Sequence, residues 1–429
     1  MPGGDCWGFS GLAPETLFVS IRPAMVNDAD VVIIGGGPGG STAAALLAAR
    51  GRRVVVLEKE HFPRFHIGES LLPYNRRLFK ELGIESELER AGYIRKTGAQ
   101  FHAANGRHSA QFIFRNGRFT REAEAYQVER AGFDELLLRN AQSKGAEVRE
   151  GWSVEKFSHE GDHVVVTARD GSGAVEQVRG RFLIDASGRG NLTGNQEGLK
   201  EMHPRHKKLA IYGHFKGVGR CEGERGGDTV IVRLPNKWFW LIPIGPDKVS
   251  VGAVIDKDEF ARDGRSAAEI FQALVGSSEV MRQRMAGADL MRPLEVTTDF
   301  SYRNRQAGFM DPIFSAGVFL AMMTSRMAAG IADKALERGD DGGADLERYE
   351  RRVRNSMELY WRMVEAFYTQ PFMELFFSPT ERLSLQSAVN AVLAGELEAG
   401  WKLVWRLKLF FFLVKLQGRF PLVPRVALG

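Results

Sequence analysis

The chain has 429 residues, of which 44% are hydrophobic and 26% charged, and its net charge is +5. This length suits two or three packed units, and the composition is ordinary for a globular protein. The mild positive charge suits an anionic cofactor or an acidic partner, and without a nucleic-acid motif it does not predict nucleic-acid binding. The two cysteines, Cys6 and Cys221, lie in no CxxC pair. They favour a reducing cytoplasm over a disulfide framework.

The two ends of the chain carry no targeting or spanning signal. Residues 1–28 show no basic-then-apolar pattern and are interpreted as a disordered or non-native extension. Residues 407–416 are apolar, but lysines interrupt them and a bilayer requires about 20 apolar residues. We therefore predict no transmembrane segment. A helix packed on the protein is the favoured interpretation, with interfacial membrane contact as the minor alternative.

A strand–turn–helix pattern follows the extension. Apolar residues 29–34 lead into a GxGxxG turn, then an Ala- and Leu-rich run, then a second apolar run that ends at Glu58. Gly35 allows the tight turn, Gly37 lets the backbone approach a pyrophosphate, and Gly40 permits close helix–strand packing. Glu58 is placed to accept hydrogen bonds from ribose hydroxyls. In this context the motif predicts a dinucleotide-binding domain.

The segment after Glu58 narrows the type of dinucleotide protein. Pro63 and Arg64, followed by Gly68, Glu69 and Ser70, resemble an element of the flavin monooxygenase superfamily, in the branch of flavin-dependent halogenases and geranylgeranyl reductases. Residues 126–134, 183–189 and 308–318 resemble further elements of that branch, in the expected order. The resemblance covers about residues 29–425.

The resemblance implies that FAD is the cofactor. It assigns the cofactor-binding residues as Gly35, Gly37, Pro38, Gly40, Ser41, Glu58, Lys59, Arg64, Ser70, Arg130, Asp185, Asp311 and Gly317. No second GxGxxG unit is present for a nicotinamide cofactor. The flavin is therefore expected to arrive as FADH2 from a separate flavin reductase.

A Trp-rich hexapeptide separates halogenases from other flavoproteins of this branch. Trp238, Trp240, Ile242 and Pro243 match every fixed position of the halogenase signature Trp-x-Trp-x-Ile-Pro. The stretch also has the pattern of a buried strand, with both Trp side chains on one face. In the family this signature lies near the flavin and is thought to disfavour direct monooxygenation.

The second feature that separates the halogenases is a lysine. Residues 92–101 resemble the segment that carries the essential lysine in halogenases of phenols and pyrroles, which makes Lys96 the catalytic residue here. Most lysines are solvated, so this assignment depends on the resemblance. The implied route uses a flavin C4a-hydroperoxide, which oxidises halide to hypohalous acid, and the lysine relays the halogen. Burial would lower the lysine pKa and increase its neutral fraction.

The resemblance also suggests a halide site and a substrate class. The turn from Ser315 matches the halide position of the family, so chloride is assigned to the backbone amides of Ala316 and Gly317. Tryptophan halogenases have Glu where Phe314 stands, which favours a phenol or pyrrole over free tryptophan. This aromatic substrate is either free or tethered to a carrier protein. Trp401, Trp405 and residues 410–412 are candidates for a docking face.

One segment departs from the family pattern. Residues 303–307 stand where the family has a strand ending in Gly-Asp-Ala, whose Asp holds the ribityl chain of FAD; about a dozen residues are missing. Loss of a central strand would expose a sheet edge. The interpretations are an internal deletion, weak flavin binding, or a catalytically impaired relative.

The predicted fold class is α/β, with three regions. Residues 29–345 form a Rossmann-type FAD-binding domain interleaved with an antiparallel β-sheet substrate domain, at approximately 95–125 and 200–300, and residues 346–429 form a helical C-terminal region. Residues 164–167 and 248–254 are interpreted as strands of the substrate-facing sheet. Aromatic residues at 361–377 predict a core between helices, or alternatively a lid.

The predicted function is FADH2-dependent halogenation, most simply chlorination, of an electron-rich aromatic in secondary metabolism. The alternatives are a flavin-dependent monooxygenase, a geranylgeranyl-reductase-like oxidoreductase, and the impaired relative. No residue is assigned to a metal.

Overall fold

The computed structural model describes residues 26–203, 206–298, 302–303, 308–309, 311–378, 382–397 and 400–428. Most of the predicted extension, residues 1–25, lies outside this part of the chain. The first strand begins at Val26, three residues before the predicted start, and Val26 already pairs with Gln177.

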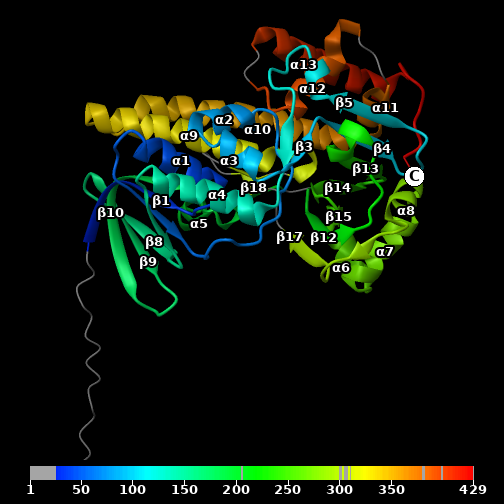
Figure 1. The fold of residues 1–429 in the computed structure, drawn as a ribbon. Helices are drawn as coiled ribbons and strands as arrows, with labels where there is room; N and C mark the ends of the chain where they lie inside the picture. Colours follow the sequence, from blue (N-terminus) through cyan, green and yellow to red (C-terminus); the bar gives the residue numbers. More distant parts are fainter. Residues whose placement is uncertain are drawn as a thin grey trace, which may run out of the picture.

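The first layer is a six-stranded sheet that begins the nucleotide-binding unit (Figure 1). In spatial order its strands are β7 (Glu147–Glu150), β2 (Val54–Glu58), β1 (Val26–Ile34), β10 (Val175–Asp185), β9 (His163–Arg169) and β8 (Ser153–Glu160). The first four strands run parallel, and β9 and β8 are antiparallel additions. The β-branched runs of β1 and β2 are buried, as expected for central parallel strands.

Helices cover this sheet and bury the turn after β1. The helices are α1 (Pro38–Ala48), α2 (Asn75–Leu82), α3 (Glu85–Arg90), α4 (Arg130–Ser143), α5 (Leu192–Gln196), α9 (Ala316–Arg338) and α10 (Gly343–Phe367). Every residue of α1 is buried, and α1 packs against both α4 and α9. Its Gly- and Ala-rich sequence explains this, because small side chains allow helices to approach closely on several sides.

The second layer is an eight-stranded sheet on the other side of the molecule (Figure 1). Its strands are β16 (Asp289–Leu290), β12 (Lys208–Lys216), β15 (Lys248–Asp256), β14 (Lys237–Gly245), β13 (Thr229–Leu234), β4 (Gly98–Ala103) and β5 (Ser109–Ile113), with β17 (Glu295–Thr298) also paired to β12. All pairings are antiparallel except that of β13 with β4.

The two faces of this second sheet enter different cores. Trp238, Trp240 and Ile242 face the main core, whereas Phe239 and Leu241 face a separate core. That separate core is closed by α6 (Lys257–Asp263), α7 (Ala267–Gly276) and α8 (Glu279–Met285). The alternation predicted for the Trp-rich strand is confirmed.

One strand assignment from the sequence was wrong. Residues 164–167 lie in β9, which pairs with β10 in the nucleotide-binding sheet and not in the second sheet. Its alternating pattern is real, but periodicity identifies a strand without identifying its partner. The other example, residues 248–254, lies in β15 of the second sheet as predicted.

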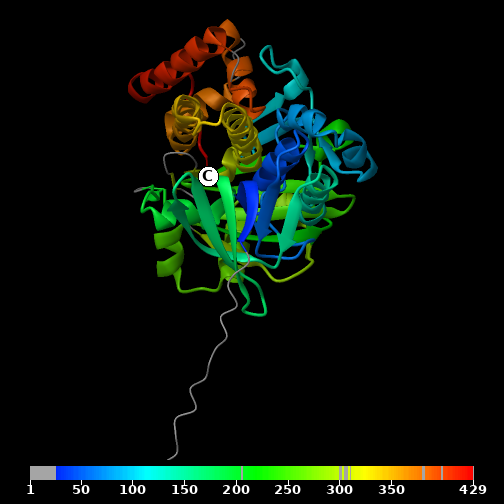
Figure 2. The same cartoon turned by 90° about the vertical axis from the view of Figure 1, so that its left-hand side faces the viewer.

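The C-terminal region is helical, as predicted, and lies along one edge of the molecule. It comprises α10, α11 (Gln370–Phe377), α12 (Leu385–Leu393) and α13 (Trp401–Arg419). Figure 2 shows α13, in red, at the outer edge, with the long helices α9 and α10 between it and the nucleotide-binding sheet. Phe367, Phe372, Phe376 and Phe377 are buried, so the aromatic run forms a core between helices.

The remaining elements are short. They are β3 (Ile94–Lys96), β6 (Ala125–Gln127), β11 (Glu201–Met202), β18 (Tyr302–Arg303) and β19 (Gly308–Phe309), and the 3-10 turns η1 (Phe114–Asn116), η2 (Gly188–Gly190), η3 (Gly223–Gly227), η4 (Pro312–Phe314) and η5 (Arg382–Ser384). None of the helices in the described part of the chain is both long and apolar enough to cross a membrane.

Candidate active site

The glycine turn between β1 and α1 has no room for a side chain at Gly35 or Gly40. A Cβ on Gly40 would lie 1.8 Å from the carbonyl oxygen of Gly35, and one on Gly35 would lie 2.6 Å from that of Ala186. Gly35 also has φ of 94°, in the left-handed region. Gly37 is the N-cap of α1, and no side chain caps this helix end. The first turn of α1, with Pro38 at its start, therefore presents backbone N–H groups of the kind that bind phosphates.

Glu58 at the end of β2 holds this turn in place. Its carboxylate accepts hydrogen bonds from the backbone N–H of Gly36 at 2.7 Å and of Glu60 at 2.9 Å. Ser41 adds a third constraint by donating from its hydroxyl to the Gly36 carbonyl at 2.7 Å. The carboxylate oxygens keep lone pairs that could accept from a ribose. Lys59, by contrast, is exposed.

Two arginines predicted to bind the cofactor converge on one buried carboxylate. Arg130 donates to Asp134 at 2.7 and 2.8 Å, and Arg64 donates to the same side chain at 3.0 Å. A Cβ on Gly37 would lie 3.5 Å from the Arg64 guanidinium, so this cation borders the glycine turn. Arg64 also pairs with the more exposed Glu60 at 3.1 Å, so two carboxylates balance the two cations. The Arg64 guanidinium still borders the turn as a donor for an anionic ligand.

Lys96, the predicted catalytic residue, is buried on a strand that contacts the Trp-rich strand β14. Its side chain lies on β3 and is 2% exposed, and its Nζ donates to the Ser70 hydroxyl at 2.9 Å and to the Leu71 carbonyl at 3.0 Å. The ring of Phe114 lies 5.6 Å from Nζ. Burial lowers the pKa of Lys96 to about 7, although the Asp228 carboxylate opposes this shift. Near neutral pH a large fraction of the amine is therefore uncharged.

Further polar groups behind Ser70 form a chain that sequence reasoning missed. The Ser70 and Thr229 hydroxyl oxygens are 2.9 Å apart, and the Gln127 amide donates to Thr229 at 2.9 Å. Glu69, the residue before Ser70, forms a buried pair with His214 at 2.7 Å. This pair links the loop after β2 to β12. Thr229 and His214 have ordinary sequence surroundings, and Gln127 lies in the family-like stretch 126–134 with no role assigned to it. Only the crossing of strands brings the three together.

The Trp-rich strand β14 lies next to β3 and connects to the loop before α9. The Trp238 indole donates to the Tyr368 hydroxyl at 2.9 Å, and that hydroxyl donates to Asp311 at 2.6 Å. Burial raises the pKa of Asp311, against the opposing effect of the Tyr368 hydrogen bond. Tyr368 is thus a link between the signature strand and the start of α9, a role that its spacing in the sequence, which indicated an aromatic core or a lid, did not predict.

The second signature tryptophan is fixed by a glycine on the neighbouring strand. The Trp240 indole donates to the Ser250 hydroxyl at 3.1 Å, and a Cβ on Gly252 would lie 2.2 Å from its ring. The indole therefore lies flat over the backbone of β15 at a position where only glycine fits.

The predicted halide position lies at the first turn of α9, a helix of 23 residues. Ser315 adopts φ of 55° and caps the helix without a side-chain hydrogen bond. Ala316 is buried and Gly317 is exposed, and these are the first two residues of the helix, where backbone N–H groups have no helical acceptor. Asp311 lies just before this turn and accepts from the Ile313 N–H.

The shortened segment coincides with an incomplete sheet edge. Residues 302–303 and 308–309 form a small antiparallel pair, and residues 304–307 lie outside the described residues. Residues 182–185 of β10 pair with β1, and within the described ranges no strand pairs with their other edge. Phe182, Leu183 and Ile184 are accordingly only half-buried. Asp185 accepts from the N–H groups of Ser187 and Thr193 and so closes the following turn.

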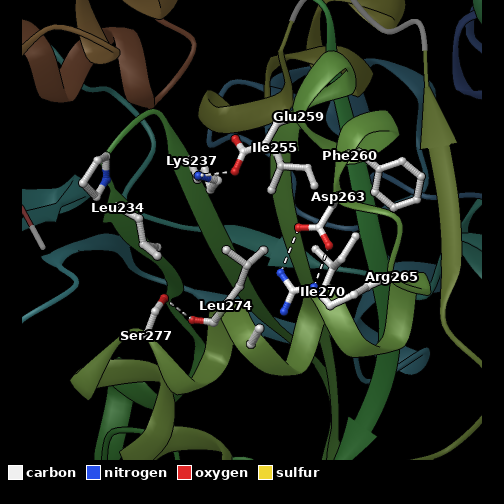
Figure 3. A pocket seen from close by; sticks show the side chains of 12 residues that line it. Leu234, Lys237, Ile255, Glu259, Phe260, Asp263, Arg265, Ile270, Leu274 and Ser277 are labelled. Atoms are coloured by element: carbon white, nitrogen blue, oxygen red, sulfur yellow. Dashed lines mark hydrogen bonds and ion pairs between the residues drawn. The ribbon is translucent and has the colours of Figure 1, made fainter.

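One cavity lies apart from these residues, whereas a histidine cluster lies beside Tyr368, whose ring is 5.4 Å from that of His206. A cavity of about 340 Å³ lies between the second sheet and helices α6 and α7, and Figure 3 shows Lys237 paired with Glu259 in its wall. None of the predicted site residues lines it. His203, His206 and Glu365 also cluster, but His203 Nδ1 accepts from the His206 N–H and its Nε2 is 3.5 Å from Glu365. These contacts already use both nitrogens of the ring, so we assign no metal.

Comparison with known proteins places this geometry in a family. The FAD binding domain family matches residues 28–273. The 1H-pyrrole-2-carbonyl-[peptidyl-carrier protein] chlorinase of Pseudomonas fluorescens is 30% identical over 414 residues, which cover 88% of this chain and 91% of the relative. The chain belongs to the flavin-dependent halogenases.

Two further likenesses agree with this family. The tryptophan 2-halogenase of Chondromyces crocatus is 32% identical over 336 residues, covering 74% of this chain and 63% of the relative. The solved structure of the flavin-dependent brominase Bmp2 has a TM-score of 0.80 at 27% identity, covering 92% of this chain and all of that chain (100%). As a flavin-dependent halogenase the chain is an oxidoreductase, and the predicted α/β fold with a Rossmann-type FAD-binding domain is confirmed.

Proposed function

We propose that this halogenase uses FADH2, supplied by a separate flavin reductase, to chlorinate an electron-rich aromatic, a pyrrole or a phenol. Lys96 carries the proposal, because it combines near-complete burial, fixed hydrogen bonds and a pKa of about 7. A lysine that served only as a surface charge would be solvated and would keep an ordinary pKa. We name the substrate class by relation to a relative that acts on a carrier-bound pyrrole.

The residues around the glycine turn fit FAD. The turn would bring its backbone to the pyrophosphate, and Glu58 would accept from the ribose. The Arg64 guanidinium beside Gly37 would donate to the phosphates, held in place by Asp134, which Arg130 also binds. Bound FADH2 supplies the reaction with oxygen that oxidises the halide. The backbone amides of Ala316 and Gly317 would hold chloride at the first turn of α9, where the helix dipole favours an anion.

Lys96 would accept the halogen as a neutral amine. The two hydrogens of that amine can go to Ser70 and Leu71, which leaves the nitrogen lone pair free. Attack by this lone pair on hypochlorous acid forms an N–Cl bond and releases water. The C–Cl bond then forms as the N–Cl bond breaks, and the ring loses its proton. An amine that only hydrogen-bonds hypochlorous acid would orient the same transfer.

The enclosure of Lys96 would protect the oxidant from other nucleophiles. The side chains of Trp238 and Trp240 lie on the face of β14 that points into the main core, and both are at most 5% exposed. Phe314 is buried against Phe367 where tryptophan halogenases have Glu. A site without that carboxylate suits a substrate activated by its own hydroxyl or ring nitrogen.

The direct test replaces Lys96 by Ala in an assay with a flavin reductase, chloride and a panel of phenols and pyrroles. We expect wild type to give products with a chlorine isotope pattern in mass spectrometry. The variant should give none, while its rate of flavin oxidation stays within about twofold of wild type. Products that gain oxygen would indicate a monooxygenase, and chlorinated product from the variant would exclude the lysine role.

A further inference from the structure

Helix α13 presents an exposed face that combines apolar and basic side chains. Trp401 is 72% exposed, Val404 48% and Phe412 56%. Lys408, Lys415 and Arg419 are exposed too, and spacings of three and four residues place the whole set on one side of the helix. Large apolar side chains exposed in one place mark interaction sites more often than chance. We call these six residues the α13 face.

All charged side chains in α13 and the segment after it are basic. Residues 400–428 contain Lys402, Arg406, Lys408, Lys415, Arg419 and Arg425 and no Asp or Glu. Among the described residues, Lys402, Lys408 and Lys415 form no ion pair. An unbalanced basic surface around apolar side chains is complementary to an acidic partner that also offers apolar groups.

The buried side of α13 packs on elements that in turn contact the surroundings of Lys96. Phe410 and Phe411, which the sequence grouped with this docking face, are buried instead and pack toward α11 and α12. In α12, the Asn390 amide donates to the Ile113 carbonyl at 2.9 Å, and the next residue, Phe114, faces the Lys96 amine. A partner on α13 would therefore dock next to α12, the helix that contacts both α13 and η1.

We propose that the α13 face docks an acidic carrier protein, which delivers the aromatic substrate as a thioester on its flexible arm. This inference rests on the proposed function. A carrier fits better than a lipid surface, because docking a tethered substrate explains why the face lies on the helices that continue to the lysine. The apolar residues would contact the helices of the carrier, and the lysines would set its orientation through charge.

The test uses the full chain and a purified, acidic holo peptidyl carrier protein loaded with a pyrrole-2-carbonyl thioester. Binding is followed by fluorescence anisotropy of the labelled carrier, and chlorination by mass spectrometry. We expect K408E/K415E/R419E to weaken carrier binding at least tenfold and to slow chlorination of the tethered pyrrole. Chlorination of a free phenol should stay unchanged. Trp401→Ala should weaken carrier binding without altering the charge.

The matched control is K144E/K334E/R351E, which makes the same charge change at exposed positions on other helices. The inference is overturned if wild type does not bind the carrier, or if the α13 variant binds as well as the control. It is also overturned if the face binds vesicles of phosphatidylcholine and phosphatidylglycerol (3:1) instead of the carrier. Failure of the proposed function looks different, because carrier binding would still depend on the basic residues while no substrate, free or tethered, became chlorinated.

Discussion

The two halves of the site border different sheets, and these sheets differ in how completely they are built. Lys96 itself lies on β3, which pairs with β6 beside β14 of the second sheet. In the nucleotide-binding sheet, the last residues of β10 pair with β1 on one side, and their other edge has no strand from the described residues. In the second sheet, β14 is paired on both sides, and Trp238 and Trp240 are buried with their indole nitrogens bonded. The shortened segment therefore lies in the cofactor half of the site, and the signature strand beside Lys96 is complete.

The largest expected effect is a loss of FAD affinity when a side chain is introduced into the glycine turn. Gly40→Ala places a Cβ 1.8 Å from the Gly35 carbonyl oxygen, so the turn must shift. A shifted turn no longer presents its N–H groups to the pyrophosphate, so we expect binding to weaken by about 3 kcal/mol, or roughly 100-fold in affinity for FAD. A titration followed by flavin fluorescence measures this loss. The control Gly276→Ala, with no atom within 4 Å of the new Cβ, should bind as wild type.

A substitution in the second sheet should impair chlorination and leave FAD binding unchanged. Gly252→Ala places a Cβ 2.2 Å from the Trp240 ring and must displace the indole. We expect chlorination to fall by about 30-fold, equivalent to roughly 2 kcal/mol of overpacking, while FAD affinity is unchanged. Gly245→Ala in β14 is the control, because its Cβ makes a milder contact, 3.2 Å from the Lys248 Cβ and 4.0 Å from the Lys248 backbone nitrogen. An equal loss of FAD affinity in Gly252→Ala would show that the two halves are not independent.

The pH dependence of halogen transfer should follow Lys96. Its pKa of about 7 lies below the ordinary lysine value because of burial, so the neutral amine predominates above pH 7 and falls about tenfold per pH unit below it. Chlorination should therefore reach a plateau above pH 7 and be roughly tenfold lower at pH 6. Product formation and flavin oxidation are measured together across pH 5.5–9. A flat product profile would contradict transfer through the neutral amine.

A smaller gain is expected from repairing the cofactor half. A strand of about a dozen residues ending in Gly-Asp-Ala, inserted between Arg303 and Gly308, would add a carboxylate for the ribityl chain and cover the edge of β10. One added hydrogen bond contributes about 1 kcal/mol, which is roughly a fivefold gain in FAD affinity. The same insertion ending in Gly-Asn-Ala is the control for coverage without charge. Unchanged affinity in both variants would mean that the shortened segment already supports the flavin.

Local sequence patterns predicted which residues form strands and turns better than they predicted which strands pair with each other. The glycine turn, the buried strand to Glu58 and the two faces of β14 follow from spacing and residue type, because each depends on a few neighbouring residues. The place of β9 in the nucleotide-binding sheet does not, since an alternating strand fits either sheet.

The same limit applies to the site. Lys96 was named from a resemblance, but its low pKa depends on residues that arrive from other strands to bury it. The links from Ser70 to Thr229 and from Trp238 through Tyr368 to Asp311 join residues more than 50 positions apart. No local pattern in the sequence encodes such contacts, and the topology creates them.

FAD binding by the purified wild-type protein is the most direct test of the central claim, that the intact glycine turn retains the cofactor despite the shortened segment. An absorbance and fluorescence titration should show saturable binding of one FAD per chain, lost in Gly40→Ala. Absence of binding, or equal binding by wild type and Gly40→Ala, would contradict the account and leave this chain with the fold of a halogenase but without its cofactor site.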